Sequence, residues 1–210
     1  TGSNSKLLSR ELSTHLTGRY LTFFIFPFSF GEYLKVFGKE FIEAEKRAHF
    51  IDYVQRGGFP EPLVKQLEFR NYLSNLYDSL LLKDIMMRYK LKSTKALQDF
   101  SSFLITNIGN FVSYNNLTRL SQIKSVHTII KYLNYLEEAF LFFTVNAFSH
   151  KVKEQIKSNK KIYVIDNGFY HAKSFALSAN LGKLFENLVA IELRKRTLRG
   201  ERYFYYYRNK

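Results

Sequence analysis

Two capped helical patterns separated by a short turn constrain this chain most strongly, and they lie within residues 113–145. Ser113 and Ser125 each precede such a pattern, where a serine hydroxyl accepts a hydrogen bond from a first-turn amide. The first pattern extends to Leu120. In the second, apolar residues recur at spacings of three and four: Val126, Ile129, Ile130, Leu133, Leu136 and Phe140. With the aromatic run 140–145, these segments predict a helix-turn-helix followed by the strand of a wing.

Composition excludes several classes of protein. The chain has no cysteine, so it forms neither disulfides nor thiolate zinc sites, and we expect a cytoplasmic protein. The five histidines are scattered without the spacing that holds a metal on one helix face. The most apolar run, 20–30, contains Pro27 and is too short to span a bilayer, so we expect no membrane partner.

The net charge of +14 predicts a polyanionic partner such as DNA, but the charge is unevenly distributed. Residues 151–210 contain 14 Lys and Arg against 5 Asp and Glu, whereas residues 96–150 contain 3 of each. The predicted helix-turn-helix is therefore neutral although positive charge normally drives contact with phosphates.

The remaining pattern predicts a mainly α fold with small β elements. Expected helices cover 6–16, 30–37 with Ser29 as its cap, 41–56, 67–89, 97–108 and a segment from Asn180 or Gly182 to Leu193. Expected strands cover 20–26, 161–165 and 203–207, and Asn167–Gly168 is a turn signal. Pro60 and Pro62 predict an extended segment after the helix end at Gly57–Gly58.

Several motifs occur in an order that resembles a family of prokaryotic AAA+ ATPases. They are TGSNSKLLS, LTGRYLTFFIFPFSFGEYL, YVQRGGFPEPL, LYDSLLLKDIMMRY, NIGNFVSYNNLTRL, KYLNYLEEAFLFF, KKIYVIDNGFYHAKSF and NLGKLFENLVAIELRKR, and in this order they extend over nearly the whole chain. That family has a helical lid, a winged helix and a nuclease-like C-terminal region of the PD-D/EXK type. The resemblance implies an ATPase core remnant at 1–37, a lid at 38–95, a winged helix at 96–150 and the start of an α/β nuclease-like domain at 151–210.

The resemblance also implies roles in ATP hydrolysis for residues near the start of the chain. Asn4 is the first candidate for sensor 1, a polar side chain that orients the attacking water, and Ser3 is the second. Arg19 matches the position of an arginine finger, which requires a neighbouring subunit and hence a homo-oligomer. The alternative is that Arg19 only faces solvent after the helix end at Gly18.

The sequence lacks the GxxxxGK[ST] loop that cradles phosphates, and it lacks an acidic pair after an apolar strand for Mg²⁺. In the resembled family both precede the segment corresponding to Thr1. We therefore expect a fragment of a larger ATPase, whose missing N-terminal region is a partner and binds ATP and Mg²⁺. We expect the chain alone to bind neither tightly and to be inactive as an ATPase.

Docking of a helix-turn-helix on DNA directs the early residues of its second helix into the groove. His127, Thr128 and Lys131 occupy those positions, with Arg119 and Lys124 near phosphates. Because winged helices also bind proteins, this surface alone does not decide between DNA and a protein partner.

The C-terminal part has one candidate metal ligand. Glu186 matches the helical glutamate that, in the nuclease-like fold, joins residues of later strands in holding Mg²⁺. Asp166 occupies a recurring position of the family motif, and we interpret it as a turn residue that binds its own backbone. The basic and aromatic segment 194–208 is read as containing a core strand, with stacking on single-stranded nucleic acid as the alternative.

Two functions from different classes remain. The first is the lid, winged-helix and tail portion of an AAA+ ATPase that acts on or near DNA. The second is a stand-alone winged-helix nucleic-acid-binding module with a basic tail. A phosphate-binding loop encoded upstream of Thr1 would support the first, and an initiator methionine just before it would support the second.

Overall fold

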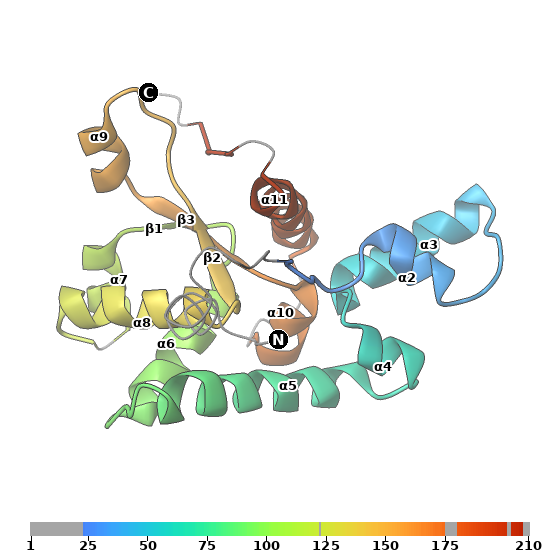
Figure 1. The fold of residues 1–210 in the computed structure, drawn as a ribbon, viewed down its shortest axis with the longest axis horizontal. Coiled ribbons are helices and arrows are strands. Elements are labelled where there is room, and N and C mark those ends of the chain that lie inside the picture. Colours follow the sequence, from blue (N-terminus) through green and yellow to red (C-terminus); the bar gives the residue numbers. More distant parts are fainter. Residues whose placement is uncertain (1–22, 122, 175–179, 201–202, 208–210) are drawn as a thin grey trace.

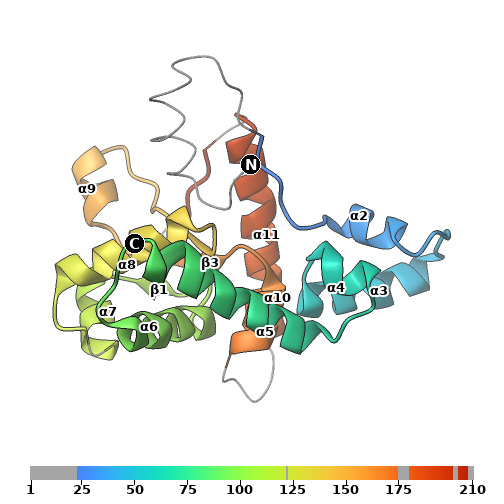
Figure 2. The same cartoon turned by 60° about the horizontal axis from the view of Figure 1, so that its bottom comes forward.

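The computed structural model describes residues 23–121, 123–174, 180–200 and 203–207. This part of the chain is mainly helical with small β elements, as the sequence predicted, and its strands form one three-stranded antiparallel sheet. Figure 1 shows α2 and α3 projecting at one end, while α7 and α9 lie at the other, and Figure 2 shows the same separation. The predicted helix 6–16 lies outside the described residues.

The projecting arm consists of α2 (Phe30–Lys35) and α3 (Glu43–Arg56). Ser29 caps α2 as predicted: the Glu32 amide donates to Ser29 Oγ, and the Ser29 amide donates to the Glu32 carboxylate at 2.7 Å. Helix α3 ends at Gly57, whose φ of +80° is accessible to glycine at little cost. Side chains of α2 and α3 meet in a cluster of aromatic rings that includes Phe30, Tyr33 and Tyr53.

The strand predicted at 20–26 is not found in its described part. Residues 23–26 have no strand conformation, and the side chains of Phe23 and Ile25 are 81% and 94% exposed. Because a strand is stabilised by hydrogen bonds to a neighbour, an apolar run with no paired strand beside it does not keep this structure.

The segment after α3 also differs from the prediction. Pro60 and Pro62 lie in a short helix, α4 (Pro60–Val64), rather than in an extended segment. Proline is favoured at the first helical position, where its fixed φ suits the helix and its missing N–H is no loss. The helix predicted at 67–89 is present as α5 (Phe69–Leu80), which continues into a π-helical segment, η1 (Leu81–Met87).

The middle of the chain forms the sheet and the helices that cover it. In chain order its elements are α6 (Thr94–Thr106), β1 (Phe111–Val112), α7 (Tyr114–Leu120), α8 (Val126–Glu138), β2 (Phe142–Val145), α9 (Val152–Lys157) and β3 (Lys160–Val164). Strand β3 is central in the order β1-β3-β2, and both pairings are antiparallel. Phe111 pairs with Lys161 on one side, and Phe143 pairs with Tyr163 on the other.

Two helices follow the sheet. Helix α10 (Asn167–Lys173) begins at the residues predicted as a turn, because Asp166 acts as its N-cap and accepts a hydrogen bond from the Gly168 amide. Helix α11 (Leu181–Leu198) begins after Asn180, as predicted, and continues five residues beyond the predicted end.

The aromatic strand predicted at 203–207 is wrong. Only Tyr206 makes a bridge, to Ala147, and the side chains of Tyr203 and Tyr207 are 83% and 77% exposed. The aromatic run 203–207 therefore does not form a buried strand.

The main hydrophobic core joins most elements of the described chain, and a second, smaller cluster includes Phe143, Tyr163 and Ile191. The main core contains side chains from α3, α5, η1, α6, α7, α8, α10, α11 and the three strands. Phe169 of α10 lies at its centre, against the rings of Phe59 and Tyr77. Helix α10 therefore connects the arm, the sheet and α5 within one packed interior. No helix of the described residues is long and apolar enough to cross a membrane.

Candidate functional site

The α7–turn–α8 unit has the local structure that its sequence predicts. Ser113 Oγ accepts a hydrogen bond from the Asn116 amide at 3.2 Å, and Ser125 Oγ accepts one from the Thr128 amide at 3.4 Å. Each cap satisfies an amide of the first helical turn, so both helices begin at the predicted residues.

The apolar side of α8 packs in the hydrophobic core, so its polar side faces solvent. Ile129, Leu133 and Leu136 are buried, each at most 4% exposed. The predicted contact residues lie on the opposite side or in the turn: Arg119, Lys124, His127 and Lys131 are exposed, and Thr128 is half-buried. The structure thus places the five predicted residues along one accessible stretch of the chain.

The acidic residues of α8 lie at its C-terminal end and are engaged within the molecule. Glu137 Oε1 accepts hydrogen bonds from the amide and hydroxyl of Thr144 at 2.9 and 2.8 Å. The Glu138 carboxylate accepts a hydrogen bond from the Tyr89 hydroxyl. Residues 96–150 are therefore neutral because Glu137 and Glu138 near the C-terminus of α8, together with Asp99 of α6, balance three cations exposed around the N-terminus of α8.

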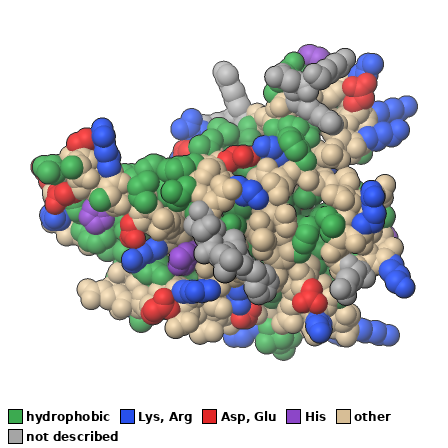
Figure 3. Space-filling model, turned by 180° about the vertical axis from the view of Figure 1, so that it is seen from behind, with side chains coloured by type: hydrophobic (Ala, Val, Ile, Leu, Met, Phe, Trp, Pro, Cys, Tyr) green, Lys and Arg blue, Asp and Glu red, His purple; other side chains and the backbone are tan. Residues whose placement is uncertain are grey.

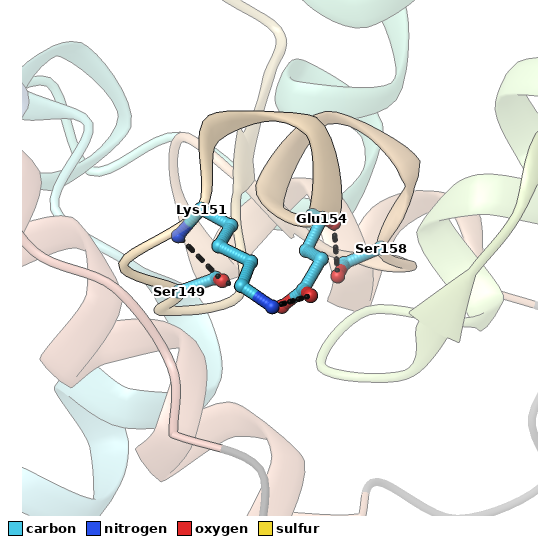
Figure 4. Close-up of polar contacts among 4 residues, drawn as sticks. All are labelled: Ser149, Lys151, Glu154 and Ser158. Carbon is cyan, nitrogen blue, oxygen red and sulfur yellow. Dashed lines mark hydrogen bonds and ion pairs between the residues drawn. The ribbon is translucent and has the colours of Figure 1, made fainter.

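The connection between β2 and β3 carries exposed lysines beside this unit. It contains α9, which has no buried residue and exposes Lys151, Lys153 and Lys157. Figure 4 shows how its first turn is fixed: Ser149 Oγ accepts from the Lys151 amide at 3.1 Å, and Lys151 Nζ lies 3.3 Å from Glu154 Oε1. This geometry neutralises Lys151 locally, and no such pair is found for Lys153 or Lys157 among the described residues.

The Glu186 carboxylate, predicted as a metal ligand, is bound by two side chains of β3. Lys161 Nζ and the Tyr163 hydroxyl donate to Glu186 Oε1 at 2.7 and 2.8 Å. Burial and the hydrogen bond to Glu186 raise the pKa of Tyr163, which keeps this phenol protonated as a donor. Within the described ranges no three His, Cys, Asp or Glu residues gather into a metal site. The metal role of Glu186 stays a prediction.

Asp166 is the buried acidic residue of the described chain. Its side chain is only 5% exposed, and its two oxygens accept from the amides of Gly58 and Gly168, both at 2.8 Å. Burial raises the pKa of Asp166 to about 6, although the two amides and Lys195 oppose this shift. The interpretation as a turn residue was incomplete, because one of its two partners lies in a distant segment.

Two buried amides extend this polar cluster to β3 and α11. Asn187 Nδ2 and Oδ1 bind the carbonyl and amide of Val164, each at 3.0 Å, in the manner of a neighbouring strand. Asn167 Nδ2 donates to the carbonyls of Val54 and Leu184 at 2.8 and 3.0 Å. We call Asp166, Asn167 and Asn187 the buried polar cluster. Sequence reasoning missed it, although an acid and an amide directly after the apolar run IYVI were a usable signal.

The arm carries a groove on its surface. It has a volume of about 870 Å³ and lies between α2, α3 and residues 62–69. Tyr33, Phe37, His49, Asp52 and Phe69 are among its lining residues. Figure 3, which views the molecule from behind, shows hydrophobic side chains gathered over this arm. Its acidic residue Asp52 is engaged within the molecule: Arg56 Nε lies 2.7 Å from Oδ1, and the Tyr33 hydroxyl donates to Oδ2 at 2.8 Å.

Ser3, Asn4 and Arg19, predicted from the resemblance to take part in ATP hydrolysis, lie outside the described residues. The described residues contain two candidate functional features. The first is the exposed basic surface around the start of α8, and the second is the buried polar cluster that joins the arm to the C-terminal helices.

Comparison with known proteins identifies the class to which this chain belongs. A family described as "Domain of unknown function (DUF8612)" matches residues 47–180, which is more than half of the chain, and the chain belongs to that family. Residues 1–34 match an AAA domain. The AAA resemblance is thus confirmed at the level of this domain, in the segment that contains Ser3, Asn4 and Arg19.

Two relatives extend well beyond this chain. An uncharacterized protein of Haemophilus influenzae is 36% identical over 204 residues, covering 93% of this chain and 50% of the relative. An uncharacterized protein of Methanocaldococcus jannaschii is 35% identical over 223 residues, covering 98% of this chain and 49% of the relative. The chain therefore spans about half the length of the curated relatives it matches. No solved structure matches it significantly.

Proposed function

We propose that this chain is the nucleic-acid-contacting portion of an AAA-type ATPase. The observation that carries the ATPase part is the order of the matches: residues 1–34 match an AAA domain, and 47–180 match the family that follows it. ATP and Mg²⁺ are bound by the longer protein, whose phosphate-binding loop precedes these residues. The match at 1–34 favours this reading over a stand-alone binding module.

The nucleic-acid part of the proposal is supported by topology. The order α6, β1, α7, α8, β2, β3, with β3 between β1 and β2, corresponds to a winged helix-turn-helix in which the connection containing α9 is the wing. In this geometry the N-terminal half of α8 faces the groove of a duplex.

Charge placement supports a polyanionic partner for the same surface. Arg119, Lys124 and Lys131 are the Lys and Arg residues of segment 96–150, and all three are exposed around the turn and the first half of α8. Glu137 and Glu138 are bound to Thr144 and Tyr89 and lie at the other end of the helix. A duplex docked at the start of α8 meets cations first, and His127 and Thr128 are placed to reach base edges.

Duplex titration at two salt concentrations tests this proposal. A labelled duplex binds the chain, and the affinity falls steeply between about 50 and 200 mM salt because bound cations release counterions from DNA. Combined Lys124→Ala and Lys131→Ala substitution weakens binding and reduces the salt slope by about 2, since each phosphate contact contributes about one unit.

The matched control is Lys46→Ala, which removes an exposed lysine of α3 at the far end of the molecule. Unchanged binding in this variant shows that the effect is local rather than a response to net charge. Equal losses in both proteins, or no salt-dependent binding by the wild type, would contradict the proposed surface. A protein partner for this winged helix is the alternative in that case.

The longer protein tests the ATPase part. Calorimetry on the 210-residue chain should detect no tight Mg²⁺-dependent ATP binding, whereas a protein extended upstream through the phosphate-binding loop should bind it. Arg19→Ala in the extended protein should abolish hydrolysis while leaving ATP binding intact, if the arginine acts on a neighbouring subunit in a homo-oligomer.

We propose a cytoplasmic location for the longer protein, and the absence of cysteine from this chain agrees with it.

A further inference from the structure

Residues 26–28, here called the strap, lie within the AAA-matching segment 1–34 and contact the rest of the fold. The Phe28 amide donates to the Gly58 carbonyl at 2.7 Å, and the Tyr53 hydroxyl donates to the Phe28 carbonyl at 2.7 Å. Lys195 Nζ donates to the Pro27 carbonyl at 3.4 Å and lies 5.5 Å from the centre of the Phe26 ring. The strap is thus held by both α3 and α11.

The anchoring points of the strap are themselves fixed by the buried polar cluster. Gly58, which binds Phe28 through its carbonyl, donates its amide to Asp166 Oδ2 at 2.8 Å. Asp166 lies two residues after the end of β3 and caps α10. Asn187 of α11 binds both backbone groups of Val164 in β3. Asn187 also donates to Asn167 Oδ1 at 2.8 Å, so hydrogen bonds and the covalent link between Asp166 and Asn167 together connect the strap to the central strand of the sheet.

The backbone is packed so closely at this junction that three glycines have no space for a side chain. A Cβ on Gly57 would lie 1.8 Å from Asp166 Oδ1, one on Gly58 would lie 2.2 Å from the Phe28 carbonyl oxygen, and one on Gly168 would lie 2.4 Å from the Arg56 carbonyl oxygen. Three backbone segments from separate parts of the chain approach each other closely. Close-packed interiors transmit displacement rather than absorb it, because they switch between arrangements instead of deforming gradually.

We propose that this junction couples the AAA region to the winged-helix unit: the strap passes a nucleotide-dependent displacement through Gly58 and Asp166 to β3, and duplex binding acts back along the same contacts. The inference rests on the proposed function. It goes beyond that function by naming the residues through which the two activities communicate. Tyr53 and Lys195 are positioning residues, since neither lies at the nucleotide or on the duplex-facing surface.

The test measures ATP hydrolysis by the full-length protein with and without duplex. Tyr53→Phe removes the hydroxyl that binds Phe28, and Lys195→Met removes the ammonium that binds Pro27 while keeping an apolar stem. In each variant, basal hydrolysis and duplex affinity should stay within about twofold of the wild type. The stimulation of hydrolysis by duplex should fall at least about fivefold, the lower end of known allosteric couplings.

The matched control is Tyr72→Phe, which removes a hydroxyl that binds Glu61 away from the strap and should leave stimulation unchanged. Thermal unfolding of each variant verifies that it is folded at the assay temperature. Wild-type stimulation in both Tyr53→Phe and Lys195→Met would overturn the coupling role, as would a wild type that hydrolyses ATP and binds duplex without any stimulation. A wild type that fails to bind duplex or to hydrolyse ATP overturns the proposed function itself, and the coupling inference falls with it.

Discussion

The side chain of Asp166 accepts a hydrogen bond from the backbone amide of Gly58 at 2.8 Å, although 108 positions separate the two residues. The other carboxylate oxygen caps α10 through the Gly168 amide. One buried side chain therefore fixes the end of α3 and the start of α10 in a single arrangement. The motifs YVQRGGFPEPL and KKIYVIDNGFYHAKSF each supply one residue of this contact, which explains structurally why both are present.

The contact predicts a severe effect of Gly57→Ala. The new methyl group would meet Asp166 Oδ1 at 1.8 Å, and the backbone φ of +80° adds strain. We expect the free energy of unfolding to fall by at least about 3 kcal/mol, from the clash, the strain and the disturbed hydrogen bonds together. Urea unfolding followed by circular dichroism measures this change.

Gly38→Ala is the control for that substitution. Gly38 has a φ of +65° but no atom within 4 Å of its added Cβ, so only the backbone strain remains, at about 1 kcal/mol. Similar losses in the two variants would show that the contact with Asp166 adds nothing.

Asn187→Ala tests the side chain that pairs with β3. Asn187 is fully buried, and its amide binds the carbonyl and the amide of Val164 as well as Asn167 Oδ1. Removing it leaves buried polar groups without partners, and we expect a loss of about 2–4 kcal/mol in unfolding free energy. Asn134→Ala, at an exposed position of α8, should change the same quantity by less than about 0.5 kcal/mol. A loss of that small size for Asn187→Ala would contradict the pairing.

Asp166 also predicts a pH dependence of stability. Burial raises its pKa from 3.8 to about 6, so between these values the folded protein retains a proton that the unfolded chain releases. The contribution of Asp166 to the free energy of unfolding is therefore greatest below about pH 4 and falls as the pH rises to about 6, by about 1–3 kcal/mol. Unfolding of the wild type and of Asp166→Asn, measured across this range, isolates the effect as a changing difference between the two proteins. A difference that is constant with pH, or that grows as the pH rises, would contradict the raised pKa.

Local signals in the sequence were sufficient for the helix starts. Ser29, Ser113 and Ser125 were predicted as caps and Asn180 as one of two possible helix starts, and each accepts a hydrogen bond from the residue three positions later. Because such a bond depends on a few adjacent residues, the surrounding fold does not alter it. The polar face of α8 was predictable for the same reason, since helical periodicity separates it from the buried stripe.

Features that depend on distant partners were not predictable. Asn167–Gly168 has the composition of a turn, but Asp166 and the packing of Phe169 against Phe59 and Tyr77 make these residues the start of a helix. Residues 203–207 are all aromatic and were predicted as a strand, yet only Tyr206 finds a bridge partner. The intramolecular partners of Glu137 and Glu138, which decide how the charge of α8 is displayed, likewise require the fold.

Mapping of the duplex on the chain by nuclear magnetic resonance tests the proposed function most directly. Titration of a short duplex into isotope-labelled protein at low salt should shift the backbone amide signals of residues 119–131 most strongly, with smaller shifts at Lys153 and Lys157 of α9. Signals of residues 43–48, at the start of α3 and away from Tyr53, should not move. The account is contradicted if saturating duplex leaves the 119–131 signals unchanged, or if the shifts are confined to the arm.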